Sequence, residues 1–382
     1  MRAFPIRLPS GKTYWTVLDD HLQPVSAADE FLQHTRLGRD RAETTTKSYA
    51  EALALYLAWC QQTGRDWKAA DRLGSFITWL RHTPTRPRRR RAQPRPGIQV
   101  VRGERRVNFV LTVVREFLKH EVTIGAVPAE VLTRLYQIAD ARDLPPEVRG
   151  EDSSLRYYAK VRHRLDEPDT PVDNATDEEV IGLLRACHSA RDRFIVLALA
   201  RTGIRRGELT GLRLEDIHFV ADASALGCTV PGAHLHVRRR ENPNGAWAKS
   251  KRPRAVPVDH LVVQAYDQYC LERAACPPAQ GCDFVLVNLF RAPLGAPMPP
   301  GALNELFVEL SRRAKLDRPV HPHMLRHGFG TAVSEAGGSL DELQELMGHA
   351  SLSSTRIYTH PSYARLRAAV ERVPAPGEGA RR

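Results

Sequence analysis

The sequence has few cysteines and no long apolar stretch, and both absences limit the class of protein. Six cysteines stand at positions 60, 187, 228, 270, 276 and 282, with no CxxC pair among them. This spacing is typical of reduced thiols, although a disulfide or a metal between Cys276 and Cys282 stays open. The longest apolar run, residues 194–200, is far too short to span a bilayer, and residues 1–12 lack a signal-peptide core. We therefore expect a cytoplasmic protein without a membrane anchor.

Negative charge is also in deficit. Lys plus Arg exceed Asp plus Glu by 56 to 44 in 382 residues, which gives a formal net charge of +12 and a pI near 9.7. This balance favours an anionic partner, and nucleic acid fits better than a membrane because no amphipathic anchor accompanies the charge. The length allows two or three domains, each with its own core.

The first part of the chain predicts a helical domain. Residues 1–27 form a short N-terminal segment whose loose alternation around Ser10-Gly11 suggests a hairpin. Residues 28–140 have apolar positions at helical spacing, which predicts an all-helical domain. Its expected helices lie at 44–64, with N-cap hydroxyls at 44–46, and at 73–80, 107–120 and 129–139.

An insertion rich in arginine and proline, residues 84–106, separates the second and third of these helices. It contains nine arginines, four prolines, one glutamate and no lysine, so its net charge of +8 is two-thirds of the excess of the whole chain. Proline excludes a regular helix, and like charges keep such a segment extended. Because arginine matches phosphate bidentately, we interpret the insertion as a loop that follows DNA. A merely solvated insertion is the alternative.

The second half of the chain predicts a mixed domain. Residues 141–175, which are basic and contain several prolines, are expected to form an exposed linker. Thr176 and the three acids after it are typical of a helix start, so we place a second domain at 176–373 and a tail at 374–382. Short strands at 216–220, 234–238 and 254–258 predict a small antiparallel sheet. The expected fold class is α+β, mostly helical.

Four segments of this domain carry residues that suit one chemistry. They are TGIRRGEL (202–209), AKSKRPRAVPV (248–258), HPHMLRHGFGT (321–331) and LMGHASLSSTRIYTH (346–360). A phosphodiester is an anion whose transition state carries still more charge. Cleaving it without a metal requires fixed cations, proton donors and a nucleophile.

Spacing within these segments predicts how their side chains act. Arg205 lies at a helix start, where phosphate binds readily, and Glu208 one turn later can hold it by a charge-assisted bond. His323 and Arg326 share a helix face and can address one phosphate together, whereas His327 is expected to turn away.

A zinc site is the alternative for the histidines at 321, 323 and 327. Histidines so close together can bind a metal. No Cys, Asp or Glu lies near them in sequence to complete a site, which disfavours this interpretation.

Together the four segments resemble the tyrosine recombinase (phage integrase) family of DNA strand-exchange enzymes. The resemblance covers roughly residues 28–372, with strong motif identity in the last half only. Matching motif by motif implies a catalytic set of Arg205, Lys249, His323, Arg326, His349 and Tyr358. One departure is Gly328, where many members carry Ser or Thr, and it lies outside this set.

The resemblance also implies a role for each of these residues. The two arginines would bind the scissile phosphate, and His323 would help to move the proton of the tyrosine hydroxyl. His349 would hydrogen-bond the phosphate, and Tyr358 would be the nucleophile. Lys249 would be the general acid for the leaving 5′ oxygen. It is placed by counting back from Arg254-Ala-Val-Pro, and Lys251 is the alternative.

The resemblance extends to architecture and partners. The helical domain would cover one side of double-stranded DNA and the catalytic domain the other, as a C-shaped clamp. No metal or ATP is implied, because the bond energy is kept in a 3′-phosphotyrosine. A homo-oligomer, as a tetramer on synapsed DNA, and an accessory directionality factor are expected partners. Residues 362–373 would form a helix that docks on a neighbouring protomer or packs in cis.

The function expected from the sequence is site-specific recombination that integrates or excises a mobile element. Residues 1–27 are too short for a separate arm-binding domain. A type IB-like topoisomerase or resolvase, which nicks and reseals DNA without exchanging partners, is one alternative. A catalytically silent DNA-binding clamp is the other, although binding alone does not require Lys249, His349 and Tyr358 together.

Overall fold

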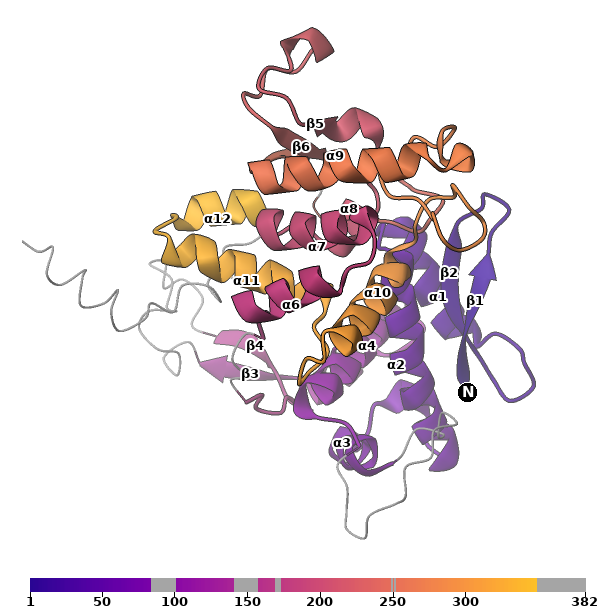
Figure 1. The fold of residues 1–382 in the computed structure, drawn as a ribbon. Helices are drawn as coiled ribbons and strands as arrows, with labels where there is room; N and C mark the ends of the chain where they lie inside the picture. The colour runs from indigo at the N-terminus through magenta and orange to yellow at the C-terminus, as the bar shows by residue number, and fades with distance from the viewer. Residues whose placement is uncertain (84–100, 141–156, 169–172, 249, 251, 349–382) are drawn as a thin grey trace, which may run out of the picture. The chain divides into compact units, whose positions relative to one another are not determined.

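The chain divides into two compact units, Met1–Asp169 and Thr170–Arg382. The computed structural model describes residues 1–83, 101–140, 157–168, 173–248, 250 and 252–348 (Figure 1). Each unit has its own hydrophobic core among these residues. The expected domain bounds, with a linker at 141–175, stay a prediction.

The first unit combines a β-hairpin with helices. Strands β1 (Arg2–Arg7) and β2 (Thr13–Leu18) pair antiparallel, which confirms the expected hairpin. The helices are α1 (Ser26–Gln33), α2 (Glu43–Gln62), α3 (Leu73–His82) and α4 (Glu104–Thr123), with short turns η1 (His34–Gly38) and η2 (Trp67–Ala69). Their apolar faces bury Phe31, Tyr56, Phe76 and Phe117. The hairpin adds Tyr14 and Val17 to this core and is therefore part of the unit.

The start of α2 differs from the expected threonine cap. Its N-cap is Ala42, whose side chain caps nothing. Thr46 lies inside the first turn, where its hydroxyl donates to the Glu43 carbonyl at 2.7 Å and accepts from the Trp15 backbone N–H at 3.3 Å. The hydroxyl thus ties the hairpin to the helix, a contact that local sequence cannot show.

The prediction of a helix at 129–139 is wrong. Short turns η3 (Ala129–Val131) and α5 (Leu132–Leu135) give way to strand β3 (Tyr136–Asp140), which pairs antiparallel with β4 (Tyr157–Val161). The presumed linker therefore contains a strand. Tyrosine and isoleucine suit a strand, but the pairing partner lies about twenty residues away, beyond the reach of periodicity.

The basic insertion ends in ordered structure. Arg102 is only 8% exposed and donates to the carbonyls of Leu80 and Thr83, both at 2.8 Å. Arg105 and Arg106 lie in α4, so the expected loop stops before them. Arg102 therefore holds the end of α3 instead of facing DNA. Residues 84–100 lie outside the described part.

The second unit combines helices with a small sheet. The strands β5 (Ile217–His218), β6 (His234–Val237) and β7 (Arg254–Pro257) form the expected antiparallel sheet, and their order in it is β5-β6-β7. Each strand is shorter than expected. The helices are α6 (Asp177–Ala186), α7 (Ala190–Thr202), α8 (Arg206–Leu209), α9 (His260–Ala274), α10 (Pro300–Arg313), α11 (Pro322–Glu335) and α12 (Leu340–Met347). Single turns are η6 (Leu214–Asp216), η7 (Ser224–Leu226) and η8 (Pro277–Ala279).

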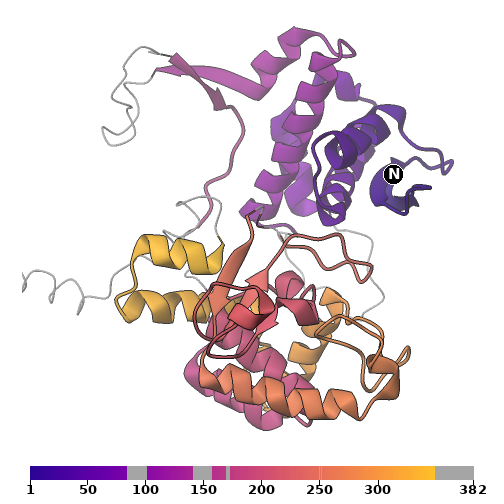
Figure 2. The same ribbon diagram turned by 90° about the horizontal axis from the view of Figure 1, so that it is seen from above.

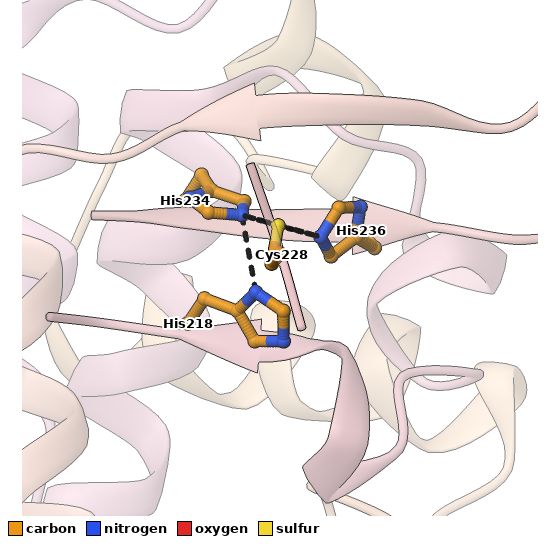
Figure 3. A group of neighbouring side chains, drawn as sticks. All are labelled: His218, Cys228, His234 and His236. Carbon is orange, nitrogen blue, oxygen red and sulfur yellow. Dashed lines mark hydrogen bonds between the residues drawn. The ribbon is translucent and has the colours of Figure 1, made fainter. Parts of the chain in front are cut away.

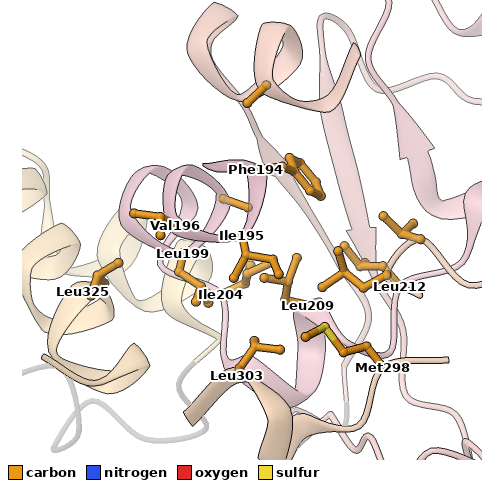
Figure 4. Packing of buried hydrophobic residues seen from close by; sticks show 14 of the residues in the cluster. Phe194, Ile195, Val196, Leu199, Ile204, Leu209, Leu212, Met298, Leu303 and Leu325 are labelled. Carbon is orange, nitrogen blue, oxygen red and sulfur yellow. The ribbon is translucent and has the colours of Figure 1, made fainter. Parts of the chain in front are cut away.

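Helix α7 is the centre of this unit. It packs against both α9 and α11, and its side chains Phe194, Ile195 and Leu199 are fully buried (Figures 1 and 4). Burying such side chains stabilises the unit by about 1.5–3 kcal/mol each.

Thr176 and Glu179 form the predicted capping box at the start of α6. Helices α11 and α12 lie side by side (Figure 2). None of the helices in the described ranges is long and apolar enough to cross a membrane.

Candidate active site

Arg205 lies at the junction of two helices. Helix α7 ends at Gly203, whose φ of +61° is left-handed, and Arg205 is the N-cap of α8. Its guanidinium donates to Glu208 Oε1 at 2.9 Å, and its backbone N–H donates to Glu208 Oε2 at 2.9 Å. The predicted Arg205–Glu208 bond is therefore confirmed. The arginine side chain keeps 23% of its surface exposed, while the glutamate side chain is fully buried.

Glu208 also binds Arg254 of strand β7. Arg254 Nη2 donates to Glu208 Oε2 at 2.9 Å, and only 2% of the arginine side chain is exposed. Burial would raise the pKa of Glu208, but the charges of Arg254 and Arg205 outweigh it and the pKa lies below its usual value. The buried glutamate is thus an anion that holds two cations.

The end of helix α12 accepts hydrogen bonds from three arginines. Arg254 Nε donates to the Leu346 carbonyl at 3.2 Å, Arg326 Nη2 to that of Met347 at 2.5 Å, and Arg205 Nη2 to that of Gly348 at 3.3 Å. The last carbonyls of a helix lack helical partners and carry the negative end of its dipole, so cations are stabilised there. We call Arg205, Glu208, Arg254 and Arg326 the arginine network.

Arg326 is the most deeply placed member of this network. It lies on α11 with 2% of its surface exposed, and its other amino group donates to the carbonyl of Gly203. One guanidinium therefore joins the end of α7 to the end of α12. The two predicted phosphate-binding arginines, Arg205 and Arg326, are thus brought to adjacent residues of one turn, Met347 and Gly348.

His323 lies on the first turn of α11 and is exposed. Its ring centroid is 4.1 Å from that of His327, with the rings at 72°. The expectation that His327 turns away is wrong, because residues four apart share a helix face. Burial, with the charges of His323 and Arg326 next, lowers the pKa of His327 to about 4. His327 is therefore neutral near pH 7, and it lies close to His323 and Arg326, two of the predicted catalytic residues.

Three predicted catalytic residues, Lys249, His349 and Tyr358, lie outside the described residues, as does the alternative Lys251. Gly348, whose carbonyl Arg205 contacts, directly precedes His349 in the sequence. The catalytic roles of Lys249, His349 and Tyr358 therefore stay predictions.

Gly328 has a packing explanation. A Cβ at this position would lie 3.0 Å from the Ala175 carbonyl oxygen, tighter than an ordinary contact. The Ala175 backbone N–H donates to the Met324 carbonyl at 3.1 Å, which draws this segment onto α11. Glycine therefore permits a close approach of α11 to the entry to α6.

Sequence reasoning missed two features. The first is Arg254, which the sequence motif used only to locate Lys249. Because Arg254 alternates with the buried Val256, it lies on the inward face of a strand. The second feature is a group of nitrogen and sulfur donors on strands β5 and β6 and on the connection between them, and it includes none of the histidines at 321–327. A His-x-His pattern in β6 was its available signal.

Comparisons with known proteins identify the family. Residues 174–365 match the model of the phage integrase family. Tyrosine recombinase XerD of Halalkalibacterium halodurans is 31% identical over 199 residues, which are 50% of this chain and 58% of that protein. Transposase A from transposon Tn554 of Staphylococcus aureus is 24% identical over 365 residues, 94% of this chain and 92% of that protein.

A solved structure shares the fold. It is the XerH site-specific recombinase bound to a palindromic difH substrate in a post-cleavage complex, with a TM-score of 0.52 and 17% identity. The match covers 93% of this chain and 91% of that one. Because the family model matches half of the chain, this protein belongs to the phage integrase family, the tyrosine recombinases, which cleave and rejoin DNA strands by transesterification.

Proposed function

We propose that this protein is a site-specific recombinase that integrates or excises a mobile element. The match to the Tn554 transposase supports this proposal because it runs through both units, including the N-terminal one. Double-stranded DNA is the proposed substrate, and a homotetramer on synapsed DNA is the proposed assembly. A directionality factor is a further proposed partner, and the cytoplasm, where such DNA is found, is the proposed location.

The catalytic set that we propose is Arg205, Lys249, His323, Arg326, His349 and Tyr358. The observation that carries it is the convergence of Arg205 and Arg326 on the turn at Met347 and Gly348. Two guanidiniums at one point suit the extra negative charge of a pentacoordinate phosphate. Glu208 and Arg254 are positioning residues, because they hold Arg205 without being exposed themselves.

Phosphate binding requires a change at this turn. The amino groups of Arg326 donate to the carbonyls of Gly203 and Met347, and the side chain is buried. We propose that the scissile phosphate takes the place of one of these carbonyls. A phosphate oxygen carries negative charge that a carbonyl oxygen lacks, and arginine pairs strongly and bidentately with phosphate, so phosphate competes for these donors.

The proposed reaction exchanges one phosphate ester bond for another at each step. A free phenol has a pKa of about 10, so Tyr358 needs the nearby cations to attack at neutral pH. The Tyr358 hydroxyl passes its proton to His323, and its oxygen forms a bond to phosphorus as the bond from phosphorus to the 5′ oxygen breaks. Lys249 donates a proton to that leaving oxygen. A 5′ hydroxyl then attacks the phosphotyrosine and releases Tyr358, so no external energy source enters.

The test is covalent trapping. Tyr358→Phe should keep DNA affinity and lose the covalent adduct, because it removes only the nucleophilic oxygen. A suicide substrate followed by a denaturing gel measures the adduct. Tyr363→Phe, five residues further on, is the matched control and should form the adduct normally. An undiminished adduct in Tyr358→Phe would refute the assignment, and an adduct absent from the wild-type protein would favour a silent clamp.

A type IB-like topoisomerase shares this chemistry and would pass the trapping test. Exchange between two DNA duplexes that carry different labels separates the two functions. Recombinant product supports the proposal. Relaxation of supercoils without any recombinant product would favour the topoisomerase.

A further inference from the structure

Strand register places three histidines on one face of the small sheet. His218 of β5 lies directly opposite His234 of β6, and His236 is two residues further along the same strand. Side chains at alternate positions share a face, so all three imidazoles are on one side. Leu235 and Val237 point to the other side, into the hydrophobic core.

A cysteine joins this group from the connection between β5 and β6. That connection, residues 219–233, contains η7, and Cys228 follows it, where the Cys228 backbone N–H donates to the Ala223 carbonyl at 3.2 Å. Figure 3 shows the sulfur and the three rings turned toward one another. Cys228 Sγ is 3.3 Å from His234 Nε2 and 3.4 Å from His236 Nε2. We call His218, Cys228, His234 and His236 the histidine–cysteine cluster.

Hydrogen bonding alone does not satisfy this cluster. His234 Nδ1 is 2.7 Å from the Gly232 carbonyl, which can only accept, so Nδ1 carries a proton. In a neutral ring, Nε2 then has a single lone pair. Three partners lie around it, with His218 Nδ1 and His236 Nε2 both at 3.2 Å and Cys228 Sγ at 3.3 Å. His234 is 1% exposed, and the four residues of the cluster include no carboxylate.

A tetrahedral metal ion fits the same geometry. Zinc binds imidazole nitrogen at about 2.0–2.1 Å and thiolate at about 2.3 Å, so tetrahedral ligand atoms lie about 3.3–3.6 Å apart. Four pairs in the cluster are 3.2–3.4 Å apart, and all four ligand atoms lie within 4.8 Å of one another. The bond from His234 Nδ1 to a backbone carbonyl is the usual outer partner of a metal-bound histidine.

We propose that His218, Cys228, His234 and His236 bind one Zn²⁺ as a closed structural site. Three imidazoles and one thiolate are donors that zinc prefers, and four protein ligands leave no position for substrate. The ion fastens the long β5–β6 connection to the sheet. Strand β7 of the same sheet carries Arg254 on its opposite face, so the site supports the arginine network without entering the reaction.

Metal analysis of the purified full-length protein tests the proposal directly. We expect about one zinc per chain in the wild-type protein, falling below about 0.2 in Cys228→Ser and in His236→Ala. Cys276→Ser is the matched control, because Cys276 is another partly buried free cysteine outside the cluster, and it should keep the metal. Zinc-free wild-type protein that cannot be loaded with Zn²⁺, or equal zinc in Cys228→Ser, would overturn the proposal.

Cobalt substitution keeps the test independent of how well a variant folds. Chelated wild-type protein reloaded with Co²⁺ should show the visible bands of tetrahedral cobalt and a near-ultraviolet thiolate-to-cobalt band. Cys276→Ser should show both. Octahedral cobalt spectra without the thiolate band in the wild-type protein would contradict a site of this composition.

Stability and cleavage separate a structural ion from a catalytic one. Chelation should lower Tm by at least about 4 °C, and added Zn²⁺ should restore it. Brief chelation at a temperature where the protein stays folded should leave DNA cleavage unchanged, and loss of cleavage there would refute the structural role. Tyr358→Phe should bind zinc like the wild-type protein, so failure of the proposed catalytic function would not affect this result.

Discussion

Single side chains set the local chemistry of the site. Arg205 is held by Glu208, and Glu208 in turn by Arg254, so a buried anion fixes a partly exposed cation.

The two candidate general acids, Lys249 and Lys251, are distinguished at this scale by a leaving-group experiment. Lys249→Ala should slow cleavage at an ordinary 5′ oxygen far more than at a 5′ sulfur, which needs no proton. Cleavage rates on the two substrates measure this difference, with Lys251→Ala as the control. If the sulfur rescues Lys251→Ala and not Lys249→Ala, the general acid is Lys251.

His327 makes stability depend on pH. Its pKa is about 4 in the folded protein, below the 6.5 of a free histidine. Between these values the unfolded chain binds more protons, so the free energy of unfolding falls as pH drops from 6.5 toward 4. His327→Gln should weaken this dependence, by less than about 1.4 kcal/mol per pH unit because one half-buried ring is involved. Urea unfolding at pH 7.5, 6 and 5 measures it. Parallel curves for the two proteins would contradict the depressed pKa.

At the scale of elements, the end of α12 depends on a glycine. Gly348 has φ +58°, and a Cβ there would lie 2.5 Å from Arg254 Nη1. Gly348→Ala should cost about 1–2 kcal/mol for the left-handed backbone and more for displacing Arg254. Gly337→Ala is the matched control, with φ +92° and no atom within 4 Å of its Cβ. Thermal unfolding should show the larger loss in Gly348→Ala. Equal losses would mean that Arg254 moves aside without cost.

At the scale of the whole molecule, the charge excess predicts how DNA binding responds to salt. Each phosphate that an arginine neutralises releases counterions, so affinity falls as salt rises. Replacing Arg88, Arg89, Arg90 and Arg91 with serine should reduce the slope of log K against log salt by up to about 3–4 units. Preference for the cognate site should survive, because phosphate contacts carry no base information. Binding to cognate and random DNA at several salt concentrations tests both. An unchanged slope would make the segment a bystander, and a lost preference would mean that it contacts bases.

The sequence by itself determined the family, the chemistry and the strongly periodic elements. Helices α2, α3 and α4 and the three short strands of the small sheet follow from local sequence patterns, which record the type of an element and which side of it is buried. The Arg205–Glu208 pair was also predictable from local sequence, because residues three positions apart are neighbours on a helix.

Only the tertiary structure decided which distant residues meet. The strand pair β3–β4, the burial of Arg326, and the approach of Arg254 to Glu208 and α12 all join segments far apart in the chain. The histidine–cysteine cluster needs both the register of two strands and the return of a fifteen-residue connection. Periodicity states that a side chain turns inward. It does not state which side chain it will meet, because that depends on the packing of all the elements together.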